Sequence, residues 1–239
     1  EDRTAARIKD LFTPGVLTRA TRLTLVNAVY FKGRWAAPFD PALTKPAPFR
    51  APGNAAAQAP LMQRRGQMRY AEMDGLQAVE LPYAGRRFVM QVLLPAPDRT
   101  VAEAVRQLAD KGLEAWEGAL AEADVTLFLP RFTCTWSREC TETLQALGMT
   151  ALFDAAAADL SGIAGQPGEL VVSAVVHKAF IEVAEEGTEA AAATAVAVRM
   201  TAFRPPEQPV VFRADRPFIY LIRERDSGCV LFAGVVNKP

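Results

Sequence analysis

Two segments of the chain are apolar on both faces of an extended strand. They are residues 23–31 and 170–184. Such a pattern predicts strands in the interior of a covered sheet. Asn27 is the strongly polar residue within the first segment, and a buried amide needs hydrogen-bond partners. We therefore expect Asn27 to tie this strand to a neighbouring one.

Three short runs with the twofold periodicity of strands follow in the first half of the chain. The turn signals Asp74-Gly75 and Ala84-Gly85 separate them, which predicts an antiparallel meander. The runs are residues 68–73, 77–83 and 88–94.

Helical spacing of apolar residues alternates with further strand patterns in the rest of the chain. Thr100 is a candidate N-cap for the first helix. There is no internal repeat and no convincing domain boundary, so the fold class predicted is α+β with mixed, largely antiparallel sheets and surface helices. Helices are expected at 101–108, 112–121 and 140–147, and strands at 125–132, 210–212, 218–223 and 229–236. The segment 44–60 is expected to be either a low-complexity connection or, at 47–50, an edge strand.

The segment 185–201 reads EEGTEAAAATAVAVRMT and is apolar where a loop would be polar. In an extended strand, alternate residues of this segment would lie on opposite faces. The residues of one face are uncharged and mostly small, and the other face is charged towards both ends. Three structures remain open for it: an alanine-rich helix, a surface loop and a strand that can enter a packed sheet. The uncharged set is Thr188, Ala190, Ala192, Thr194, Val196, Val198 and Met200.

The charge of the chain excludes one class of function. Among 239 residues, 27 are Lys or Arg and 27 are Asp or Glu. This balance removes the electrostatic case for nucleic acid or an anionic membrane as partner.

The chain has few residues that could form a catalytic or metal-binding site. Cys134, Cys140 and Cys229 fit neither a zinc site nor a redox pair, and we expect thiols outside disulfide bonds, mostly buried. With His177 as its single histidine, the chain is short of ligands and bases for a metal site or a catalytic triad. We therefore expect no catalytic residue, no metal and no cofactor, and a protein that is not an enzyme.

Several segments, in order across nearly the whole chain, resemble the serpins, a family of protease inhibitors. The resemblance is to an inhibitory, bacterial-like member. The matching segments are TLVNAVYFKGRW at 24–35, VELPY at 79–83, FVMQVLLP at 88–95, FLPRF at 128–132, LQALGMT at 144–150, VHKAFIEVAEEGTEAAAAT at 176–194, FRADRPF at 212–218 and VLFAGVVNKP at 230–239.

The resemblance implies that the segment 185–201 is a reactive-centre loop. In the family, a serine protease, or in some cases a cysteine protease, cleaves this loop, which then inserts as a new strand into the central sheet of a metastable fold and traps the protease. The family's inhibitory hinge is matched by Glu185, Gly187, Thr188, Glu189, Ala190, Ala191, Ala192, Ala193 and Thr194.

The resemblance also assigns residues outside the hinge. Asn27 and His177 match the pair that bridges the central strands where the sheet opens, and Trp35 matches the entry region of the hinge. The family's spacing places the reactive bond between Thr201 and Ala202. A register shifted by one or two residues would make Met200 or Arg199 the reactive residue instead.

The family's domain begins with helices and two central-sheet strands that have no counterpart here. We therefore expect residues 1–239 to be the C-terminal portion of a single serpin domain, with residues 5–13 resembling the end of a helix over the sheet. The alternatives are a non-inhibitory binding or carrier module and an inactive fragment. The resemblance favours a monomer in an extracellular or periplasmic location.

Overall fold

The computed structural model describes residues 8, 12, 15, 17–19, 21–54, 56–188 and 208–239. The chain forms two compact units, which are described separately. The first unit comprises residues 1–31 and 134–181, and the second comprises residues 32–133 and 182–239.

The second unit is built on one large sheet, with strand order β11-β7-β4-β5-β6-β12-β13 and with β3 beside β4. All neighbours are antiparallel except β7 and β11, which run parallel. The predicted meander is confirmed as β4, β5 and β6. The strands are β3 (Lys45–Arg50), β4 (Ala56–Met73), β5 (Leu76–Pro82), β6 (Phe88–Pro95), β7 (Ala121–Pro130), β11 (Val210–Arg213), β12 (Phe218–Glu224) and β13 (Val230–Val236).

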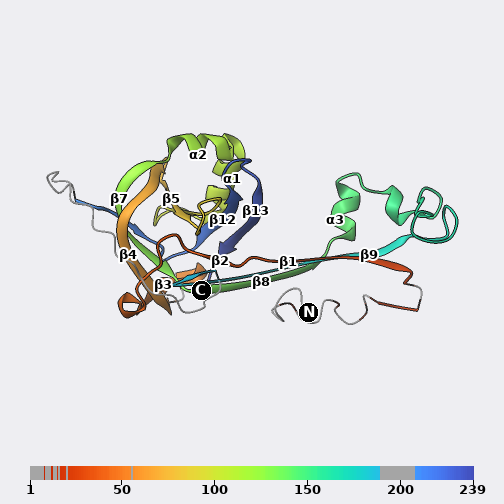
Figure 1. Cartoon of the computed structure of the whole chain (residues 1–239), viewed down its shortest axis with the longest axis horizontal. Helices are drawn as coiled ribbons and strands as arrows, with labels where there is room; N and C mark the ends of the chain where they lie inside the picture. The colour runs from red at the N-terminus through yellow and green to blue at the C-terminus, as the bar shows by residue number, and fades with distance from the viewer. Residues whose placement is uncertain are drawn as a thin grey trace. The chain divides into compact units, whose positions relative to one another are not determined.

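Two helices, α1 (Val101–Lys111) and α2 (Leu113–Ala119), cover part of this sheet (Figure 1). Thr100 caps α1 as predicted, and its hydroxyl accepts a hydrogen bond from the amide of Glu103. Trp116 of α2 is almost fully buried, at 2% exposure, and packs in one apolar cluster with residues of the sheet. That cluster contains Ala71, Leu76, Ala78, Leu93, Ala104, Trp116, Leu120, Ile219 and Leu221.

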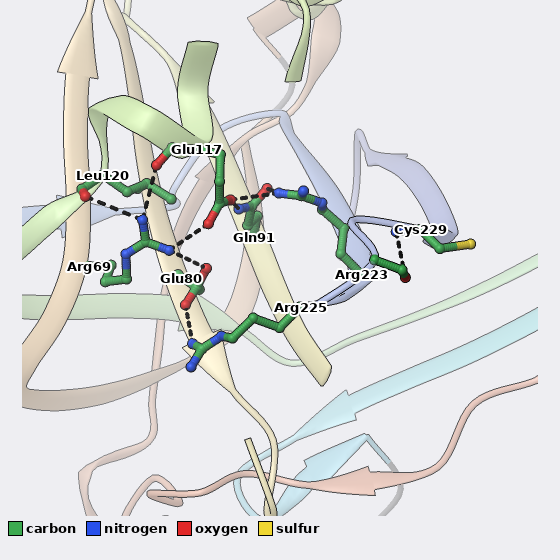
Figure 2. A network of polar contacts seen from close by, with 9 residues as sticks. Arg69, Glu80, Gln91, Glu117, Leu120, Arg223, Arg225 and Cys229 are labelled. Carbon is green, nitrogen blue, oxygen red and sulfur yellow. Dashed lines mark hydrogen bonds and ion pairs between the residues drawn. The ribbon is translucent and has the colours of Figure 1, made fainter. Parts of the chain in front are cut away.

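A polar network joins α2 to the strands beneath it (Figure 2). The carboxylate of Glu117 accepts hydrogen bonds from Arg69 at 2.6 Å, Gln91 at 2.7 Å and Arg223 at 2.6 Å. Burial opposes the ionisation of Glu117, but these donors outweigh it and hold the pKa of the carboxyl below its usual value. Three strands, β4, β6 and β12, are thereby connected to one helix side chain.

In the first unit, β1 (Leu23–Tyr30) runs parallel to β9 (Val172–Ala184), and β8 (Phe132–Glu139) also pairs with β9. The bounds of β8 and β9 include residues of both units. The register pairs Thr24 with Ala174 and continues without a break to Tyr30 and Phe180. The remaining elements within the described residues are α3 (Thr141–Ala146), β2 (Gly33–Arg34), β10 (Gly187–Thr188) and the short helical turns Pro41–Leu43, Pro52–Asn54 and Ala151–Phe153.

Some sequence predictions about the fold are wrong. Strand β1 is not covered on both faces: Leu25 is 39% exposed and Asn27 is exposed. Among the described residues, β9 pairs with one edge of β1, and a partner at the edge does not cover the faces of a strand. For the segment 44–60, the alternative of an edge strand at 47–50 is confirmed as β3, which pairs with the start of β4, and the alternative of a connection is wrong.

The cysteines follow the prediction in part. Within the described residues, Cys134, Cys140 and Cys229 form no disulfide bond. The prediction that they are mostly buried is wrong: Cys134 and Cys140 are only partly buried. Cys229 is exposed, because it follows the turn between β12 and β13. None of the helices that the structure describes has the length and apolar character needed to cross a membrane.

Candidate functional site

The chain reverses direction at the end of β9 and places the start of the predicted hinge between two strands. A turn at Glu185 and Glu186 leads into β10. There Thr188 pairs antiparallel with Val183 of β9 on one side and with Gly33 of β2 on the other. The first hinge residues are therefore already part of a sheet.

Gly187 occupies a position that excludes other residues. Its φ is 154°, within the range that residues with a Cβ rarely adopt. A Cβ at this position would also collide with the carbonyl oxygen of Gly33 and would lie 2.6 Å from Cα of Arg34. The reversal at the hinge thus depends on the absence of a side chain.

Thr188 is fully buried, with 0% exposure. Its hydroxyl forms a hydrogen bond of 2.8 Å with the hydroxyl of Tyr83. The Tyr83 ring stacks on Trp35, with ring centroids 4.5 Å apart and planes 19° apart. A buried hydroxyl pair and an aromatic stack therefore hold the start of the hinge.

Trp35 contacts both ends of the turn. Its backbone amide donates to the carbonyl of Glu186 at 2.8 Å, and its indole Nε1 donates to the carbonyl of Ala184 at 3.0 Å. The side chain is 4% exposed and meets Phe39 edge to face. Trp35 thus lies against the hinge, where the resemblance placed it.

The carboxylate of Glu185 is buried and paired. Its side chain is 7% exposed, and Arg131 donates from Nε to both carboxylate oxygens at 2.7 Å. The hydroxyl of Thr44 donates to Oε1 at 2.5 Å. Burial raises the pKa of Glu185, but these hydrogen bonds outweigh it and the net pKa is lowered, so the carboxylate is ionised at neutral pH.

An open groove of about 670 Å³ adjoins this ion pair. Residues 182–185 at the end of β9 and residues 131–133 line it, together with Pro60 and Pro239. The ion pair between Arg131 and Glu185 therefore borders an accessible depression.

Asn27 and His177 lie opposite each other in the first unit. They are register partners in the parallel pair of β1 and β9. Asn27 is exposed, so the predicted buried amide is wrong, and within the described residues no hydrogen bond joins the two side chains. The His177 ring instead contacts Trp136 of β8, with ring centroids 5.4 Å apart.

The rest of the predicted loop lies outside the described residues. This applies to the hinge from Glu189 to Thr194 and to the reactive-bond candidates Arg199, Met200, Thr201 and Ala202. The structure brings Trp35, Glu185, Gly187 and Thr188 together in the second unit, and Asn27 and His177 together in the first. Among the described residues, no group of three or more His, Cys, Asp or Glu side chains is arranged to hold a metal ion.

Sequence reasoning did not identify Arg131, Thr44 or Tyr83 as site residues. One signal was present for Arg131. A carboxylate next to an apolar strand, as Glu185 is, needs a cationic partner when it is buried. The arginine of the FLPRF segment was a candidate for that role.

Comparison with known proteins finds relatives that match the whole chain. The sequence model of the family Serpin (serine protease inhibitor) matches residues 1–239. Antithrombin-III of Mus musculus is 37% identical over 240 residues, which cover 100% of this chain and 51% of that protein. The chain thus spans about half the length of this relative.

Solved structures agree with the sequence relatives. Serpin48 of the insect Tenebrio molitor is 31% identical, with a TM-score of 0.80, and the match covers 100% of this chain and 62% of that one. Human thyroxine-binding globulin, solved with bound thyroxine, is 28% identical, with a TM-score of 0.85 and coverage of 100% and 61%.

Proposed function

The chain belongs to the serpin family, whose sequence model matches its whole length, and from this membership we propose that it inhibits a serine-type endopeptidase as a suicide substrate. Members of this family act as protease inhibitors rather than enzymes, and a reactive loop with strand insertion is characteristic of the fold. The observation that best supports inhibition is the buried Thr188, which begins a run of small residues.

Small hinge residues suit insertion because each inserted side chain must fit between packed strands. Thr188 is fully buried next to Tyr83. Ala190, Ala192 and Thr194 continue the same parity in the sequence and are no larger than threonine. Such residues enter a core with little steric or desolvation cost.

Insertion requires β1 and β9 to separate, because they are paired directly. Their parallel register from Thr24 and Ala174 to Tyr30 and Phe180 leaves no room for a strand between them. In the proposed mechanism, protease cleavage frees the loop, β1 and β9 part, and the loop pairs with both. Asn27 and His177 sit opposite each other on the two strands that must part.

The gain from insertion is large enough to trap a protease. About a dozen inserted residues, at roughly 0.5–1.5 kcal/mol net for each hydrogen bond, give on the order of 10 kcal/mol. This equals the stability of a typical whole domain. The protease, held as an acyl-enzyme, would be carried with the loop and distorted.

We place the reactive bond between Thr201 and Ala202, with Met200 and Arg199 as alternative reactive residues. Threonine or methionine at that position suits elastase-like, subtilisin-like or chymotrypsin-like proteases with apolar pockets. Arginine suits a trypsin-like protease with an acidic pocket. Which of these three neighbouring residues precedes the cleaved bond therefore determines the class of the target protease.

The proposal is tested by incubating the full-length protein with a panel of these proteases. A complex that resists SDS supports inhibition, whereas loop cleavage without a complex contradicts it. Mass spectrometry of the released loop peptide then identifies the reactive bond. Cleavage after Arg199 by a trypsin-like protease would overturn the assignment to Thr201 without affecting inhibition.

A second candidate is a carrier or binding module without inhibitory activity. The similarity to thyroxine-binding globulin, a protein solved with a bound small molecule, favours this candidate. A non-inhibitory member would gain no thermal stability when its loop is cleaved, because no strand would insert. The alanine-rich hinge argues against this alternative, since nothing in its core-facing set is charged or proline.

A further inference from the structure

A second cavity in the second unit, of about 430 Å³, has a cationic lining that the inhibitory mechanism does not use. It lies between the end of β3, the start of α1 and the connection from β11 to β12. None of the described residues that line it is acidic. The lining that matters here consists of Arg50, Arg99, Val101, Ala102 and Arg216.

The guanidinium of Arg216 is held in place within the fold. Its side chain is 16% exposed. Nε donates to the carbonyl of Pro95 at 2.8 Å, and Nη1 donates to Asp215 Oδ1 at 3.1 Å. A guanidinium fixed in this way presents its remaining donors in a defined direction.

Positive charge exceeds negative charge around this group. Asp215 is contacted by three guanidinium groups: Arg216 at 3.1 Å, Arg213 at 3.4 Å and Arg50 at 3.8 Å. One carboxylate cannot neutralise three cations, so two positive charges are left over. Burial lowers the pKa of Arg216, and the nearby charge of Arg50 acts in the same direction, against the hydrogen bond that Arg216 donates to Asp215.

Arg99 and the first turn of α1 add to the positive potential. Arg99 Nη1 donates to two uncharged acceptors, the carbonyl of Asp74 and the side-chain oxygen of Gln107. Val101 and Ala102 are the first two residues of the helix, where backbone N–H groups have no acceptor within the helix. Glu103 offsets part of this charge, but its carboxylate is engaged by Thr100.

We propose that this cavity binds a compact tetrahedral oxyanion, the phosphate or sulfate group of a small ester. Guanidinium groups bind such oxyanions through paired N–H donors, and the helix amides suit the same ligand. The volume exceeds that of an inorganic ion, so a small organic group attached to the oxyanion also fits. The ligand would connect β3, α1 and the β11–β12 connection.

The test is isothermal titration calorimetry of the full-length protein with inorganic phosphate and, separately, inorganic sulfate. Ionic strength is held constant with sodium chloride so that general screening is the same in every titration. We expect saturable binding of both ions, and the ratio of the two affinities shows whether phosphate or sulfate is the better fit. Absence of binding of both ions overturns the proposal.

Arg50→Gln tests the site, and Arg65→Gln is the matched control. Both arginines lose the same charge and are similarly exposed, at 57% and 55%, but Arg65 pairs with Asp124 outside the cavity. We expect Arg50→Gln to weaken phosphate binding about tenfold, as the loss of one charge-assisted contact implies. Arg65→Gln should leave the affinity within about twofold. Equal affinities in the two variants, with unchanged circular dichroism, would show that the cavity is not the site.

Discussion

The hydroxyl groups of Tyr83 and Thr188 form a hydrogen bond of 2.8 Å between two residues that are 105 positions apart in the sequence. Both residues are buried, at 2% and 0% exposure. The contact fixes the first residues of the hinge to the second unit's large sheet, since Tyr83 directly follows β5. Any movement of the hinge must break it.

Tyr83→Phe should therefore destabilise the chain by about 1–3 kcal/mol, because the hydroxyl of Thr188 loses its partner in a buried position. Urea unfolding measures the change in free energy. The double variant Tyr83→Phe/Thr188→Val removes both hydroxyls and should be more stable than Tyr83→Phe alone. Additive effects of the two substitutions would show that the hydroxyls are not coupled.

Glu185→Gln should lower stability at neutral pH by about 1–2 kcal/mol, a value reduced by the partial exposure of Arg131. The pKa of Glu185 is depressed below its ordinary value of 4.5. The ionised carboxylate therefore stabilises the fold above about pH 4.5, and this contribution is lost as pH falls through the lower, folded-state pKa.

Unfolding free energies measured from pH 7 to pH 3 check this prediction. The wild type and Glu185→Gln should converge towards the acid end of the series. In the background Arg131→Gln, the same comparison should show a smaller pH dependence. A difference between wild type and Glu185→Gln that is constant with pH would contradict the assigned ion pair.

Thr188→Arg should displace the start of the hinge from the sheet, because an unpaired charge is costly where exposure is 0%. The arginine would then have to be buried when the loop of the full-length protein inserts, which should slow insertion. The variant is then expected to be cleaved as a substrate, with more inhibitor consumed for each protease molecule trapped. Thr188→Ser keeps the hydroxyl and the small size and is the control. If the stoichiometry of inhibition by Thr188→Arg is unchanged, the prediction that the alternate hinge residues beginning with Thr188 must be buried is wrong.

Gly187→Ala should destabilise the fold by about 1–3 kcal/mol or more, since its φ is unfavourable and a Cβ meets the backbone of β2. Gly66→Ala is the comparison, because Gly66 has no such φ and a Cβ there meets nothing within 4 Å. That substitution should change the free energy of unfolding by less than about 0.5 kcal/mol. Thermal unfolding of both variants measures these changes, and equal losses of stability in the two variants would contradict the prediction.

Sequence patterns predicted the strands whose apolar residues form a clear pattern. Strand β9 was found because it is apolar on both faces, and the meander of β4, β5 and β6 because its runs follow the twofold periodicity of strands between turn signals. The first half of β4 was missed, because residues 56–67 are rich in alanine, glutamine and arginine. That segment is extended since it pairs with β7 and β3, which local sequence does not reveal.

Only the site residues that belong to a family motif could be predicted from the sequence. The positions of Trp35, Glu185, Gly187 and Thr188 followed from the family resemblance, and the buried pair of Glu185 with Arg131 did not. These two residues are 54 positions apart, and the preference of a carboxylate for a cation does not say which of many arginines meets it. The hinge beyond Thr188, the reactive bond and the assignment of the chain to one domain stay predictions.

The indole of Trp35 has a further use because it donates to Ala184 and stacks on Tyr83. Tryptophan emission responds to the loss of a hydrogen bond and to water entering its surroundings. In a variant whose Trp116 and Trp136 are replaced by phenylalanine, the emission comes from Trp35 alone. A spectrum of that variant followed in time after loop cleavage would therefore report when the turn at Glu185 rearranges.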